Sequence, residues 1–165
     1  MLILGIDPGT TAIGCALIKM ERGQPMLEQA QILAIRSRSA PDRLRELHEA
    51  LEALIRRAKP DAAAVERLFF TKNAKTAIAV AESRGVILLT AALAGLSVFE
   101  YTPLQIKKAL TGDGNADKKQ VKKMIQLTLR ANVPVRAQDD LYDAIAAGLT
   151  CCFLERRNWT QSSLS

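Results

Sequence analysis

The sequence predicts an α/β fold in which helices flank a mixed five-stranded sheet, and three observations support this prediction. The N-terminal region contains three apolar runs joined by short turns, which is typical of an antiparallel meander. After position 39, the apolar residues change to helical spacing. Two further short apolar runs then alternate with helical patterns, which gives the order βββαβαβ followed by more helices.

The three strands of the meander are expected at residues 2–7, 12–20 and 26–36. The segments "PGTT" and "RGQP" divide them, since Pro and Gly favour tight turns. The strands therefore lie next to one another in chain order.

The first helix begins after Ser39 and Pro41, a typical start signal. Its apolar stripe is formed by Leu44, Leu47, Leu51, Leu54 and Ile55. The remaining elements are a strand at 62–66, a helix at 72–95, a strand at 97–101 and helices near 103–110, 117–131 and 138–157.

The chain of 165 residues suits one domain, which we expect to span residues 1–157 with a flexible tail at 158–165. The formal net charge is +6 and the isoelectric point is near 9.5. This balance favours a polyanionic partner, with nucleic acid as the first expectation and a membrane surface as the second.

The cysteine and histidine content restricts the possible chemistry. Three cysteines lie in apolar stretches without CxxC spacing, so they are expected to be core residues in a reducing compartment. A single histidine, His48, argues against a histidine-ligated zinc site and a Ser-His-Asp triad. We expect a cytoplasmic protein, because Asp7 interrupts the N-terminal apolar run and no uncharged stretch is long enough to span a membrane.

Two acidic residues stand where predicted strands end. Asp7 closes the first strand and Glu66 closes the fourth, and each directly follows apolar residues. Functional residues gather at the carboxyl ends of strands in open α/β sheets. Each residue taken alone fits a simple turn or exposed strand end equally well.

The segment "QDDLYDAIAAGL" adds two more carboxylates to this set. Asp140 and Asp143 are three residues apart and share one face of a helix, so their charges repel. A divalent cation removes that repulsion, whereas capping of the helix N-terminus explains Asp139 more readily than Asp143. Four carboxylates without histidine favour Mg²⁺ or Mn²⁺, and two such ions about 3.5–4 Å apart suit phosphodiester cleavage.

Most of the positive charge lies between residues 104 and 130, where seven cations face two anions for a net +5. A solvated surface is the simplest explanation. Lys107 and Lys118 differ from the other lysines in their context, because Lys107 follows a predicted strand and Lys118 opens a helix after "TGDGNA". We expect both near the Asp7 rim, where a lysine stabilises transition-state charge on a phosphate. The neighbouring lysines predicted to bind DNA are Lys108, Lys119 and Lys122.

The segment "ERLFFTKN" places two aromatic residues just after Glu66. We expect one of them to fill the core and the other, Phe69, to stack on or wedge between bases. Lys72 and Lys75 follow in the first turn of a helix, where positive charge opposes the helix dipole. Contact with phosphate is the function predicted for these two lysines.

Taken together, "GIDPGTTAIGCALI", "VERLFFTKNAKTA", "SRGVIL", "EYTPLQIKKALTGDGNADKKQVKKMI" and "DDLYDAIAAGL" resemble the RuvC-type Holliday-junction resolvases over residues 1 to about 155. The resemblance implies an RNase H-like fold and a homodimer that cuts four-way DNA junctions by metal-dependent hydrolysis in recombination and repair. It also implies cooperation with the RuvA–RuvB branch-migration complex.

By motif position, the catalytic carboxylates of the family fall on Asp7, Glu66, Asp140 and Asp143. Its motif lysines fall on Lys107 and Lys118, and its junction-engaging aromatic residue falls on Phe69. The last motif departs from the alanine-rich form that is usual in the family, since Leu141 and Tyr142 replace small residues. The resemblance leaves open whether Asp139 or Asp140 is the ligand.

Three other interpretations are open on the sequence. A YqgF-like RNase H-fold protein shares the opening Asp-x-Gly motif and acts on RNA, but it is usually shorter and lacks the "NADKKQV" segment. An actin-like phosphate binder needs two such domains. A non-catalytic junction-binding protein keeps the lysines and does not need the acids or a metal ion.

Overall fold

The structure is a computed structural model that describes residues 1–67, 74–130, 133 and 138–155, with side chains omitted at 74–76. Its strands are β1 (Leu2–Asp7), β2 (Ala12–Glu21), β3 (Gln24–Ala34), β4 (Ala62–Glu66) and β5 (Ser97–Tyr101). Its helices are α1 (Ala40–Ala58), α2 (Ala74–Leu93), α3 (Pro103–Thr111), α4 (Lys118–Thr128) and α5 (Asp139–Leu154).

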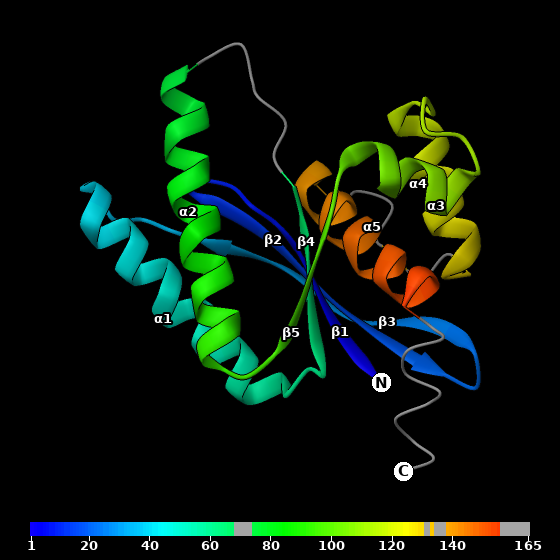
Figure 1. Cartoon of the computed structure of the whole chain (residues 1–165), viewed down its shortest axis with the longest axis horizontal. Helices are drawn as coiled ribbons and strands as arrows, with labels where there is room; N and C mark the ends of the chain where they lie inside the picture. The colour runs from blue at the N-terminus through cyan, green and yellow to red at the C-terminus, as the bar shows by residue number, and fades with distance from the viewer. Residues whose placement is uncertain (68–73, 131–132, 134–137, 156–165) are drawn as a thin grey trace.

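The five strands form one mixed sheet in the order β3-β2-β1-β4-β5. The first three strands pair antiparallel, as the sequence predicted, and β1, β4 and β5 run parallel. Strand β1 therefore lies at the centre of the sheet, between the meander and the parallel pair (Figure 1).

Helices cover both faces of the sheet (Figure 1). On one face, α1 and α2 cover a core that includes Leu4 and Ile6 of β1. On the other face, α3, α4 and α5 cover a core that includes Ile3. Successive side chains of a strand point to opposite faces, so a central strand covered on both sides is apolar at every position.

The predicted elements are present, with differences at their ends. The β2–β3 turn is shorter than expected because Arg22 and Gly23 both have positive φ angles, of 49° and 80°, which allows pairing to continue to Glu21 and Gln24. Helix α2 ends at Leu93, two residues early, and Gly95 follows in the left-handed conformation. Helix α4 ends at Thr128 and α5 at Leu154, each three residues before the predicted end.

Two predictions about the core and the membrane can be compared with the structure. All three cysteines are buried and free, as expected for small core residues. In the part of the chain that the structure describes, no helix has the length and apolar character needed to cross a membrane. The predicted tail at 158–165 lies outside the described residues.

Candidate active site

The central parallel strands bring the first two predicted carboxylates together. Ile6 of β1 pairs with Val65 of β4, and the next residues along the two strands are Asp7 and Glu66. The two acids therefore end neighbouring strands at the same edge of the sheet. Both side chains are only partly accessible to solvent.

Helix α5 approaches this edge closely because glycines lie beneath it. A Cβ on Gly14 would lie 2.1 Å from the carbonyl oxygen of Asp140, and a Cβ on Gly5 would lie 2.1 Å from that of Ala144. Gly14 pairs with Asp7 across the β1–β2 ladder. The missing side chains thus allow the first turn of α5 to rest directly beside Asp7.

The first two turns of α5 carry Asp140 and Asp143, both half-buried. The N-cap residue, Gln138, makes no capping hydrogen bond through its side chain. Negative charge in the first turn compensates the helix dipole, which helps α5 to begin at this point. The structure therefore brings together four carboxylates from β1, β4 and α5.

Burial and mutual repulsion perturb the ionisation of this cluster. Burial, followed by the charges of Asp143, Glu66 and Asp140, raises the pKa of Asp7 to about 8. Burial and then the charge of Asp143 raise the pKa of Glu66 to about 7. Burial also raises the pKa of Asp143, although Lys118 opposes this shift. The cluster therefore carries more negative charge than its surroundings neutralise.

Two lysines of α4, Lys118 and Lys122, contact the aspartates at the start of α5 in different ways. Lys122 donates a hydrogen bond of 2.6 Å to Asp139, and this contact lowers the pKa of Asp139. Asp139 is exposed and faces α4, whereas Asp140 contributes to the negative potential at Asp7. Lys118 lies 3.5 Å from Asp143 and 3.7 Å from Asp139, and Asp143 is the main cause of its raised pKa.

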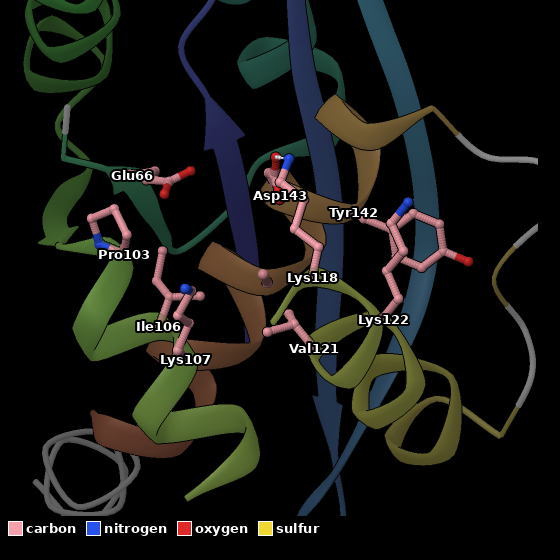
Figure 2. Close-up of a pocket in the computed structure, with 10 residues that line it drawn as sticks. Glu66, Pro103, Ile106, Lys107, Lys118, Val121, Lys122, Tyr142 and Asp143 are labelled. Carbon is pink, nitrogen blue, oxygen red and sulfur yellow. Dashed lines mark hydrogen bonds and ion pairs between the residues drawn. The ribbon is translucent and has the colours of Figure 1, made fainter. Parts of the chain in front are cut away.

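A cleft of about 210 Å³ opens beside these groups (Figure 2). Helix α3 forms one wall with Ile106 and Lys107, and α4 forms the other. Figure 2 shows the amine of Lys118 directed towards the Asp143 carboxylate, with Glu66 at the rim of the cleft. The cleft thus has two carboxylates, those of Glu66 and Asp143, and three lysines, Lys107, Lys118 and Lys122, around an apolar floor.

The donor set fits a divalent cation in chemical type. It consists of carboxylate oxygens with excess negative charge, which are the ligands that hard cations prefer. Among the described residues, however, no three acidic, histidine or cysteine side chains already form a group able to hold a metal ion. The acids lie near one another without forming a closed coordination shell.

Comparison with known proteins identifies the family. The model of the family described as crossover junction endodeoxyribonuclease RuvC matches residues 3–151. The chain belongs to the RuvC family. The resemblance drawn from the sequence motifs is therefore confirmed, and with it the assignment to a family of endonucleases.

Individual relatives cover nearly the whole chain. A RuvC from Syntrophomonas wolfei is 47% identical over 150 residues, which covers 90% of this chain and 87% of the relative. One from Moorella thermoacetica is 44% identical over 165 residues, covering 98% and 95%. The structure of Thermus thermophilus RuvC in complex with a Holliday junction substrate has a TM-score of 0.87 and 31% identity, covering 96% of each chain. The RNase H-like fold expected from the resemblance is thereby confirmed.

The other residues predicted to bind DNA or to stabilise charge differ in whether they line the cleft. Lys107 lines the cleft, whereas Lys108 and Lys119 are exposed and are not among the residues that line it. Lys122 also lines the cleft, and its amine is paired with Asp139. Phe69 and Lys72 lie outside the described residues, and Lys75 lies in α2 with its side chain outside them. The roles predicted for these residues stay predictions.

Sequence reasoning missed two features of this site. It assigned no function to Gly5 and Gly14, although both stand in apolar strands where glycine usually marks a close approach. It noted Tyr142 only as a departure from the family motif. In the structure Tyr142 is buried between α5 and α4, where Gln126 and Lys122 contact it.

Proposed function

We propose that this chain resolves four-way DNA junctions by paired, metal-dependent hydrolysis of phosphodiester bonds. The observation that carries the proposal is the cluster of four carboxylates at the end of β1 and β4, with Lys118 beside it. Membership of the RuvC family supports the substrate class, since the similar Thermus protein was solved with a Holliday junction substrate.

Asp7, Glu66, Asp140 and Asp143 are the proposed ligands of Mg²⁺ or Mn²⁺, with two ions in each site. Burial first, and then the charges of neighbouring carboxylates, raise the pKa of Asp7, Glu66 and Asp143, and a bound cation offsets both effects, which supports this assignment. Asp140 is a better candidate than Asp139, whose carboxylate is engaged by Lys122.

Divalent ions at such a site supply a polarised phosphate and a water of lowered pKa. The chain's own groups then orient the DNA and stabilise charge. Lys118 reaches the cluster from α4, and Lys107 lines the same cleft from α3. Both ammonium groups are placed to stabilise negative charge that develops on a phosphate held between the walls.

The proposed DNA-binding surface lies around this cleft. Lys108 and Lys119 are exposed next to its walls, which suits contact with phosphates. We also assign phosphate contact to Lys72 and Lys75 and base stacking to Phe69, which follow the strand that ends at Glu66 in the sequence.

The proposed active form is a homodimer, in which the two sites cut opposed strands. An apolar stripe on α2 supports this proposal, because Ile78, Leu89 and Leu93 are each more than half exposed on one face. Gly85 lies in the same stripe, and a Cβ added to it would meet no described atom within 4 Å, so a partner helix has room to approach. Cooperation with RuvA–RuvB rests on family membership alone.

The deciding experiment uses a labelled synthetic four-way junction beside a linear duplex and an RNA–DNA hybrid, each with Mg²⁺, Mn²⁺ or EDTA. We expect paired nicks confined to the junction, only with a divalent ion. Cleavage of the RNA-containing substrate would favour a YqgF-like activity, and tight junction binding without cleavage would favour a binding protein.

A further inference from the structure

Tyr142 joins helix α5 to helix α4. Its side chain is only 3% exposed, and it belongs to the core on the α5 face of the sheet. Its hydroxyl oxygen accepts a hydrogen bond of 3.1 Å from Nε2 of Gln126. A buried tyrosine needs such a partner, because an unpaired hydroxyl is costly away from water.

Lys122 makes two contacts with the same part of α5. Its Nζ lies 4.9 Å from the centre of the Tyr142 ring and 2.6 Å from Oδ1 of Asp139. Only 34% of its side chain is exposed. A lysine held by an aromatic face and a carboxylate is less available to a phosphate than an exposed lysine. We call Tyr142, Gln126, Lys122 and Asp139 the α4–α5 clamp.

The clamp reaches Lys118 in two ways, because Asp139 lies 3.7 Å from the Lys118 amine and Lys122 lies one helical turn from Lys118. Lys118 and Lys122 are four residues apart, so they lie on the same side of α4. The fully buried anchor of this helix, Ile125, lies further along it. Lys122 lies between the anchor Ile125 and Lys118 along α4, so its contacts with α5 hold the turn that carries Lys118. The Lys118 amine lies 3.5 Å from Asp143.

We propose that the α4–α5 clamp positions Lys118 for catalysis, and that Lys122 serves this contact instead of binding DNA. The inference rests on the proposed nuclease function. Tyr142 and Lys122 line the same cleft as Lys118, and we assign them as positioning residues because the Lys122 amine is engaged by Asp139 and the Tyr142 ring. Misplacement of a catalytic group by about 1 Å can cost a rate of about 100-fold.

The test measures single-turnover cleavage at saturating junction, with junction affinity measured separately in Ca²⁺ or EDTA. Tyr142→Leu and Lys122→Met should each slow cleavage by about 10- to 100-fold while changing the Kd by less than about threefold. Tyr142→Phe keeps the aromatic ring and should restore most of the rate. Leu127→Ala, on the exposed side of α4, is the matched control and should cleave at the wild-type rate.

The decisive comparison is made in a Lys118→Ala background. If the clamp acts through Lys118, adding Tyr142→Leu or Lys122→Met should slow cleavage no further. Losses that multiply would overturn the proposal. So would a Lys122→Met variant that cleaves at the normal rate but binds more weakly with a reduced salt dependence, since that result identifies a phosphate contact.

Amide hydrogen exchange of the free protein provides a readout that does not depend on activity. Both variants should exchange faster at the amides of α4 and unchanged at those of β1, and Leu127→Ala should exchange as the wild type does. If Tyr142→Leu does not fold, Lys122→Met carries the test. If the wild type cuts no junction, the proposed function fails, and unchanged exchange in α4 would separately overturn the clamp.

Discussion

Replacing Asp7 by asparagine should stabilise the metal-free protein at neutral and alkaline pH. The pKa of Asp7 is raised from 3.8 to about 8, so the folded chain retains a proton that the unfolded chain releases above about pH 4. Unfolding is therefore favoured progressively as the pH rises from about 4 to about 8. Asparagine keeps the shape of the side chain without this penalty.

The structure sets the scale of the effect. A difference of about four pKa units corresponds to an upper limit of about 5 kcal/mol, at about 1.36 kcal/mol per unit. Asp7 keeps some contact with water, and Lys118 offsets part of the repulsion. We therefore expect Asp7→Asn to raise the free energy of unfolding by about 2–3 kcal/mol at pH 8 and by little at pH 4.

The assay is urea denaturation in EDTA at several pH values, followed by the same measurement with Mg²⁺ or Mn²⁺. A metal ion at 100 times its Kd should stabilise the wild type by about 2.7 kcal/mol, whereas the variant should gain much less. Junction cleavage should be lost in the variant with binding retained. Equal unfolding free energies for wild type and variant across this pH range would refute the buried, repelling carboxylate cluster.

Three further predictions concern other parts of the molecule. Lys118→Ala should lower the single-turnover cleavage rate by about 100-fold, measured by rapid quench, while the junction Kd stays within about threefold in a binding titration. A loss of affinity alone would show that Lys118 only contacts the DNA backbone. Leu93→Glu in the α2 stripe should convert the proposed dimer to monomers in sedimentation, and an unchanged mass would move the interface elsewhere. Gly14→Ala should lower the free energy of unfolding by about 1–3 kcal/mol and abolish cleavage, because its Cβ would collide with the Asp140 carbonyl. The control Ala34→Val, on the exposed edge strand, should change stability little.

The fold was predictable because its elements depend on local patterns. The two-residue alternation and turns of the meander, and the helical spacing after Ser39, reflect burial that each segment requires by itself. The capping boxes at Thr102 and Asp117 fix the starts of α3 and α4 through contacts three residues apart. The ends of helices were less predictable, since α4 stops where Arg130 adopts a positive φ angle that no turn residue announces.

The candidate acids were selected by their position in the sequence, but their arrangement depends on packing. Asp7 and Glu66 could be paired from the rule that parallel strands end at one edge. Bringing Asp140 beside Asp7 requires α5 to contact the sheet backbone over Gly5 and Gly14. That contact joins segments more than a hundred residues apart, and although glycine in an apolar strand marks a close approach, a single sequence does not say which segment approaches.

The lysines show most clearly what a single sequence leaves open. Lys118, Lys119 and Lys122 stand within five residues on one basic helix, where the sequence set Lys118 apart by its place at the helix start but gave Lys119 and Lys122 the same prediction. The structure separates them, because Lys118 faces Asp143, Lys119 is exposed, and Lys122 contacts Asp139 and Tyr142. Tyr142 is one of the two residues that the sequence analysis set apart from the family resemblance, and its ring is one of the two contacts that distinguish Lys122. We therefore expect Tyr142 to show how this particular chain supports Lys118 at the shared site.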